Sequence, residues 1–241
     1  VFNRKDMTFS LWVKQTDNMN KEIIQFLKEL SVNNNREWFQ ANKDRFDVLH
    51  KGFIDEVQEV INRIALFDPQ VAGLASKDCQ FRIYRDLRFS PDKTPYKVHF
   101  AAYMAQGGRA SERGGYYIHL EPGACMLSGG VWCPPPKLLK MLRQDIYDHI
   151  DEFVGIIEKP SFKEAFPVME GEVLKRMPAG YPTDFKYDEI MKHKDFCFAA
   201  NLPDEFFMAD DWMDQTLKRF EELLPFNNFL NYTVDEFLGR V

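Results

Sequence analysis

The segment from Phe81 to Lys97, FRIYRDLRFSPDKTPYK, gathers the side chains best suited to chemistry with an anion. A guanidinium group binds carboxylate or phosphate oxygens at two points, and an ammonium group adds a compact charge. Two tyrosines, Tyr84 and Tyr96, could donate hydrogen bonds or stack on a ring. The segment therefore predicts a binding site for a small anion, formed by Arg82, Arg85, Arg88, Lys93 and Lys97.

The charge around this segment is opposite to that of the whole chain. Residues 77–113 carry eight cationic and four acidic side chains, whereas the 241-residue chain has a net charge of −6. A general nucleic-acid binder needs a broad basic surface to neutralise phosphates. The composition argues against such a binder and favours a small anionic ligand as the partner.

The two prolines within residues 90–96, SPDKTPY, predict a stiff turn that holds Lys93 and Lys97 at fixed positions. A preorganised site loses less conformational entropy when its ligand binds. The segment before the turn reads as a strand, and Arg85 would fall in its apolar row. An unpaired charge buried there would cost several kcal/mol, so Arg85 must find a partner or lie at a bulge.

A purely structural interpretation of these arginines stays open. They could form an internal lattice of ion pairs with three carboxylates of the chain, those of Glu37, Asp86 and Asp92. Such a lattice would leave no donor free for a ligand.

Two histidines, His99 and His119, lie on neighbouring predicted strands, each in the row opposite the apolar one. A histidine with a pKa near neutrality is the usual proton shuttle. Because the chain holds no HxH or HExxH element, a metal site made of His99, His119 and Glu121 is the less favoured interpretation. The predicted catalytic groups are His119, Tyr84 and Tyr96, without a metal, and whether the protein is an enzyme stays open.

The loop from Gln106 to Gly115, QGGRASERGG, holds four glycines and contributes Arg109 to the predicted ligand-binding set. It could fold over a ligand as a flap, or it could be a long solvated loop, which is the simpler interpretation. Since it lacks the strand–GxGxxG–helix context, it is no dinucleotide-binding fingerprint.

Apolar periodicity predicts an α+β fold in which N-terminal and C-terminal helices pack on a mid-chain antiparallel sheet. Helices are expected at about 20–30 and 36–66, from Pro134 to before Pro160, and at 162–166, 171–177, 187–193, 204–224 and 233–238. Strands are expected at about 79–89, 98–105, 116–121 and 124–132, with an edge strand at 196–202. We expect a single domain over residues 19–241, preceded by an extension at residues 1–18.

The cysteine content predicts reduced thiols. Cys79, Cys125, Cys133 and Cys197 are widely spaced and form no CxxC pair, so neither a disulfide scaffold nor a zinc site is indicated. No run of eighteen apolar residues and no signal peptide is recognisable, which favours a cytoplasmic protein without a membrane partner. No feature identifies a cofactor or an oligomeric state.

Four stretches of the chain resemble a bacterial and fungal family, "domain of unknown function 2461". They are FLKELSVNNNREWFQANK, FRIYRDLRFSPDKTPYK, GGYYIHLEPG and SGGVWCPPPKLLKMLRQDI, and the resemblance extends from about Met19 to the C-terminus. It implies a stand-alone domain but no activity and no catalytic residues. His99 stands where similar sequences are expected to carry a small polar residue, so His119 is ranked above it.

Three functional hypotheses therefore remain. The first is a domain that binds a phosphate- or carboxylate-bearing ligand, with or without catalysis. The second is a non-catalytic module whose basic face docks an acidic peptide or nucleic-acid phosphates. The third is a purely structural arginine cluster, with the function elsewhere.

Overall fold

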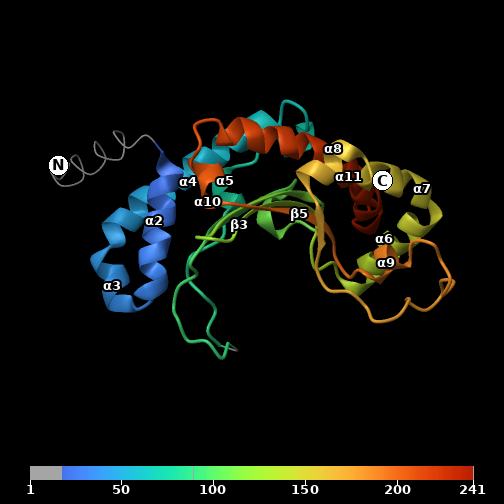
Figure 1. Cartoon of the computed structure of the whole chain (residues 1–241), viewed down its shortest axis with the longest axis horizontal. Helices are drawn as coiled ribbons and strands as arrows, with labels where there is room; N and C mark the ends of the chain where they lie inside the picture. Colours follow the sequence, from blue (N-terminus) through green and yellow to red (C-terminus); the bar gives the residue numbers. More distant parts are fainter. Residues whose placement is uncertain (1–17, 89, 241) are drawn as a thin grey trace.

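The computed structural model describes residues 18–88 and 90–240. The expected extension therefore lies outside the described residues except for its last residue, Asn18, and Phe89 lies outside them as well. The chain has an α+β fold, with a five-stranded antiparallel sheet and with helices before and after it (Figure 1). This architecture confirms the predicted fold class.

The sheet has the strand order β1-β2-β3-β5-β4. Its strands are β1 (Phe100–Met104), β2 (Gly115–Leu120), β3 (Cys125–Val131), β4 (Val168–Glu170) and β5 (Phe196–Leu202). The predicted hairpin around Pro122-Gly123 is confirmed: Gly123 has a φ of 74° and joins β2 to the antiparallel β3. The prediction of an edge strand at 196–202 is wrong, because β5 pairs with β3 on one side and with β4 on the other.

The N-terminal helices are α2 (Met19–Val32), α3 (Arg36–Ala41) and α4 (Lys43–Ile64). The predicted single helix at 36–66 is interrupted at Asn42, whose side-chain amide donates to the carbonyl of Trp38 at 2.9 Å. An amide side chain that bonds its own backbone competes with the helical pattern. Asn18 caps α2, because its side chain accepts a hydrogen bond from the backbone amide of Lys21.

Two short helical turns, η1 (Pro69–Val71) and α5 (Ser76–Cys79), lie between α4 and the sheet, and a third, η2 (Gly108–Ala110), lies in the loop between β1 and β2. The later helices are α6 (Pro136–Asp148), α7 (Ile150–Ile157), α8 (Pro160–Ala165), α9 (Asp188–Lys192), α10 (Asp204–Met208) and α11 (Trp212–Phe237). The helix expected at 171–177 is not formed; this stretch follows β4 and makes an isolated bridge from Val173 to His193.

Helix α11 is continuous through Pro225, where the sequence predicted a break. A proline inside a helix removes one backbone hydrogen bond and costs roughly 3 kcal/mol. Packing offsets this cost, since Phe220, Leu223, Phe226 and Leu230 of α11 are all fully buried. None of the described helices is both long and apolar enough to cross a membrane.

The two faces of the sheet differ because successive side chains on a strand point to opposite sides. Tyr116, Ile118 and Leu120 of β2 are buried in the core, whereas Tyr117 and His119 lie on the opposite face and are half-buried. Figure 1 shows α11 on one side of the sheet, while the segments around residues 80–98 and 171–187 extend on the other. We call the side facing away from α11 the open face.

Two buried asparagines of α11 fix the beginning of β2. Asn231 exchanges two hydrogen bonds with Gly114, at 2.7 and 3.0 Å, and Asn227 donates to the carbonyl of Gly115 at 3.1 Å. A Cβ at Gly115 would lie 2.5 Å from the carbonyl oxygen of Met104, so the close approach of the backbones requires glycine here. This packing sets the position of Tyr117 and His119 further along the strand.

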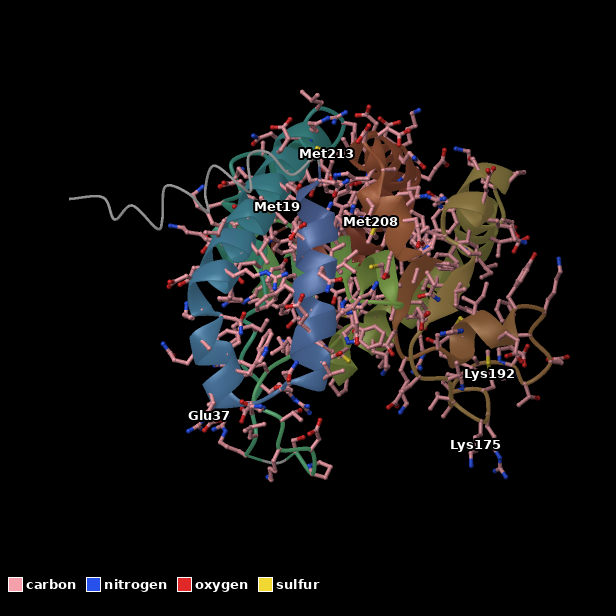
Figure 2. The ribbon with its side chains drawn as sticks, turned by 60° about the vertical axis from the view of Figure 1, so that its left-hand side comes forward. Met19, Glu37, Lys175, Lys192, Met208 and Met213 are labelled. Atoms are coloured by element: carbon pink, nitrogen blue, oxygen red, sulfur yellow. The ribbon has the colours of Figure 1, made fainter. Side chains whose placement is uncertain are left out.

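Helices α2 and α4 lie side by side (Figure 2). Met19, at the beginning of α2, lies near Met208 at the end of α10, and the side chain of Asn18 donates to the carbonyl of Met208 at 2.6 Å. Glu37, in the first turn of α3, lies at the other end of this helical layer.

The strand predicted at 79–89 is wrong. Residues 81–88 and 90–97, which we call the arm, turn back on themselves, with a single bridge from Tyr84 to Tyr96, and another bridge joins Gln80, just before the arm, to Ala102. Backbone hydrogen bonds from Arg85 to Pro95 and from Lys97 to Ile83 join its two limbs. Proline has no backbone donor, so Pro91 and Pro95 prevent a longer ladder.

Candidate functional site

Two neighbouring cavities open beside the arm, on the open face of the sheet. The larger, of about 550 Å³, extends from the beginning of β2 across β3 to β4 and β5. The smaller, of about 290 Å³, is lined by Gln80, Phe81, Arg82, Lys97 and Arg109. Because Phe81 and Arg109 line both, the two cavities form one continuous candidate site.

Three of the predicted cations meet in the smaller cavity. Arg82 and Lys97 come from opposite limbs of the arm, and Arg109 comes from η2 in the loop after β1. Among the described residues, neither Arg82 nor Arg109 has a hydrogen-bond or ion-pair partner. Burial, together with the charge of Arg82, lowers the pKa of Lys97. The three like charges therefore converge with donors available.

The other three predicted cations are held within the arm. Arg85 binds the carboxylate of Asp92 and donates to Thr94 Oγ1 at 2.6 Å, and the backbone amide of Thr94, then Arg85, lower the pKa of Asp92 to about 2. Arg88 pairs with Asp86 at 2.6 Å, and Lys93 donates to the carbonyl of Leu87 at 3.1 Å. These contacts stiffen the arm. For Arg85 and Arg88 they are the ion pairs with Asp92 and Asp86 that the structural interpretation of the sequence proposed.

The two tyrosines predicted as catalytic pack on α3 and lie outside the residues that line the cavities. Tyr96 stacks on Phe39 with ring centroids 3.9 Å apart, and Tyr84 lies against both rings. Tyr96 is 6% exposed, and burial raises its pKa. These ring contacts fix the arm to α3.

The larger cavity has an aromatic lining. Phe81 and Tyr117 meet edge to face with ring centroids 6.2 Å apart, and Met126 of β3 and Trp132, which is 61% exposed, also line the cavity. The single hydroxyl proton of Tyr103 lies between two acceptors, the carbonyl oxygens of Arg113 at 2.5 Å and Gly130 at 2.9 Å. Cavities of this size, apolar with few polar groups, are typical of small-molecule sites.

The loop from Gln106 to Gly115 is fixed at its C-terminal end. Arg113 is 3% exposed and binds Asp235 of α11 and Gln70 of η1. A buried guanidinium needs such partners, because an unpaired charge is expensive to bury. Arg113 therefore belongs to the framework, while Arg109 of the same loop is exposed beside the cavities.

The two histidines predicted on neighbouring strands do come together. Their ring centroids lie 4.4 Å apart, and His119 Nε2 lies 2.8 Å from Glu121 Oε2. His119 Nδ1 lies 2.8 Å from Tyr117 Oη, which links this cluster to the larger cavity. Burial, the neighbouring His119 and Lys97 lower the pKa of His99 to about 3, so its ring is neutral.

The cysteines supply no nucleophile at the site. All four are free, and Cys197, which lines the larger cavity, is 4% exposed. Burial raises its pKa to about 12, which leaves almost no thiolate at neutral pH.

Sequence reasoning identified the three cations but missed the aromatic lining. Alternation within GYYIHL places Tyr117 in one row with His119, but it gave no sign that Tyr117 lines a cavity. Trp132 and Phe81 gave no such signal, because the cavity they share arises from β3 and the arm meeting across the sheet.

Comparisons with known proteins identify a family but no characterised relative. No curated protein and no solved structure matches the chain. The family model described as "Conserved hypothetical protein (DUF2461)" matches residues 22–229, which include the sheet, the arm and both cavities. The chain therefore belongs to the DUF2461 family of conserved hypothetical proteins.

Proposed function

We propose that this domain binds a small organic anion on the open face of its sheet. A phosphate or carboxylate group occupies the smaller cavity between Arg82, Lys97 and Arg109, and an apolar or ring-shaped body occupies the larger one. The observation that carries the proposal is the convergence of these three cations on one cavity, where the two arginines have no hydrogen-bond or ion-pair partner among the described residues.

Electrostatics supports an anionic group at this position. Burial, and after it the charge of Arg82, lowers the pKa of Lys97, so a positive charge on Lys97 is disfavoured in the smaller cavity. An anion placed between the three cations offsets this and accepts charge-assisted hydrogen bonds from both guanidinium groups.

The volume and lining of the larger cavity support an apolar or ring-shaped body as the second part of the ligand. Its volume of about 550 Å³ would hold a body well beyond an inorganic ion. Phe81, Tyr117 and Trp132 offer ring faces and edges for stacking, and aromatic contacts of this kind add about 0.5–1.5 kcal/mol beyond the area they bury. An aromatic phosphate monoester or an aromatic carboxylic acid matches both cavities.

Calorimetry and thermal shift with phenyl phosphate, inorganic phosphate and phenol test the proposal on the full chain. Phenyl phosphate is expected to bind more tightly than either part alone. Arg109→Ala should weaken its binding by about 10–100-fold, because a hydrogen bond to a charged group is worth about 1.5–3 kcal/mol. Arg88→Ala is the matched control, since Arg88 pairs with Asp86 on the same arm.

Two results would overturn the proposal. One is equal affinity of the wild type and Arg109→Ala for phenyl phosphate. The other is binding only to long polyanions such as single-stranded DNA, with a steep dependence on salt, which would instead support a module that docks acidic or nucleic-acid partners.

A further inference from the structure

Three side chains of types that bind metals lie together where β1 begins and β2 ends. His119 and Glu121 are two residues apart, so they share the open face. The register pairs Phe100 with Leu120, and His99 and Glu121 each lie one residue beyond that pair. The strand pairing therefore brings together residues that are well separated in sequence.

The distances within the cluster suit a single metal ion. Glu121 Oε2 lies 2.8 Å from His119 Nε2 and 3.7 Å from His99 Nδ1, and one ligand atom from each residue falls within 4.8 Å of the others. Zinc bonds to nitrogen and oxygen are about 2.0–2.2 Å long, so the ligand atoms of a tetrahedral site are roughly 3.3 Å apart. Side-chain rotations that change these separations by at most about 1.5 Å bring the three atoms to that spacing.

Tyr117 supplies the outer contact that such sites use. A histidine that binds a metal through one ring nitrogen donates its other N–H to a neighbouring oxygen, which fixes the ring. Tyr117 Oη lies 2.8 Å from His119 Nδ1 and can accept this hydrogen bond when Nε2 is the ligand. His119 thus has both the carboxylate partner and the second contact that a metal ligand needs.

We propose that His99, His119 and Glu121 of this chain bind one divalent transition-metal ion, with Zn²⁺ as the best fit. Two imidazoles and one carboxylate suit zinc rather than the hard cation Mg²⁺, which prefers oxygen ligands. Three protein ligands leave at least one coordination position for water or a ligand oxygen, which is the arrangement of reactive rather than structural zinc sites.

The position is accessible to solvent. The side chains of His99, His119 and Glu121 are 24%, 13% and 32% exposed. The site adjoins the larger cavity through Tyr117, so a metal-bound water would lie on the same face as the proposed anion site. The inference needs only the three ligands and does not rest on anion binding.

Zinc binding to the full chain, first stripped with a chelator, tests the inference by calorimetry and elemental analysis. One equivalent of Zn²⁺ is expected, with Co²⁺ giving the visible spectrum of a site with nitrogen ligands and Mg²⁺ showing no binding. His119→Ala and Glu121→Gln should each weaken Zn²⁺ binding at least 100-fold. Tyr117→Phe should weaken it about 10-fold, as loss of an outer contact typically does.

His149→Ala is the matched control, because His149 is exposed and pairs with Asp145 on α6. It should leave the zinc stoichiometry and affinity unchanged. Arg109→Ala should also bind zinc as the wild type does, so a chain that binds phenyl phosphate but not zinc would overturn this inference and leave the proposed function standing.

Nitrogen NMR of the His119 ring in the wild-type chain gives a second readout, the tautomer of that ring, and needs no variant. In the metal-free chain, Glu121 favours the proton on His119 Nε2, whereas zinc at Nε2 moves it to Nδ1. A tautomer that stays on Nε2 with excess zinc, or a His119→Ala chain that keeps the wild-type zinc affinity, would refute the site.

Discussion

Asn34 and Tyr96 exchange two hydrogen bonds across 62 residues of sequence. The side-chain amide of Asn34 donates to the carbonyl of Tyr96 at 2.9 Å and accepts from its backbone amide at 3.1 Å. The side-chain amide of Asn34 therefore bonds the backbone of Tyr96 as a neighbouring β-strand would. Sequence analysis can only read such an asparagine as a helix cap, yet Asn35 caps α3 and Asn34 holds the arm.

Asn34→Ala should loosen the arm without unfolding the chain. The loss of two hydrogen bonds costs about 1–3 kcal/mol locally. Hydrogen exchange should accelerate at the amides of Arg85 and Lys97, which join the two limbs, and binding of phenyl phosphate should weaken several-fold. Asn33→Ala is the control, because its side chain bonds only the carbonyl of Glu29 within α2. Unchanged exchange in the arm would contradict this role.

Gly130→Ala should damage the sheet next to the larger cavity. Gly130 has a φ of 111°, and a Cβ there would lie 2.2 Å from the carbonyl oxygen of Phe196. We expect a loss of at least about 3 kcal/mol, or a fall in Tm of about 6–12 °C for a chain of this length. Gly123→Ala should cost only about 1–2 kcal/mol, since φ is positive but no atom lies within 4 Å of its Cβ.

Arg113→Met should lower the free energy of unfolding by about 3–5 kcal/mol, because it leaves Asp235 without its buried partner. Denaturant titration measures the loss. Arg240→Met is the control, since Arg240 reaches the same carboxylate at 3.8 Å from a side chain that is 49% exposed. It should cost less than about 1 kcal/mol. Equal losses in the two variants would show that burial does not govern this ion pair.

Glu56→Gln should stabilise the protein in a pH-dependent way. Burial raises the pKa of Glu56 from 4.5 to about 7, so the folded state binds this proton more tightly than the unfolded state does. The stability contribution of the protonated form is complete below pH 4.5 and is lost as the pH rises through 7. The shift corresponds to roughly 3 kcal/mol.

Urea unfolding at two pH values checks this sign. The variant should be more stable than the wild type at pH 8, and the difference should vanish near pH 4.5. Glu59→Gln, an exposed position on the same helix, should show no such dependence. A stabilisation that grows toward low pH would mean that the carboxylate, not the acid, is favoured at Glu56.

The sequence by itself determined the features that depend on local periodicity. The alternation in GYYIHL places Tyr117 and His119 on one face of β2, and the helical rows of α2 and α4 identify the residues of the core. These assignments hold because the direction of a side chain on a helix or strand follows from backbone geometry alone. The α+β class and the cationic arm follow from the same local evidence.

Only the tertiary structure decided which cations keep available donors. Arg82 and Arg85 look alike in sequence, but the prolines fold the arm so that Arg85 meets Asp92 while Arg82 faces Lys97 and Arg109. The meeting of His99 with Glu121 likewise depends on the register of β1 and β2. Contacts between distant segments depend on how strands pair and pack, and no local window of sequence contains that information.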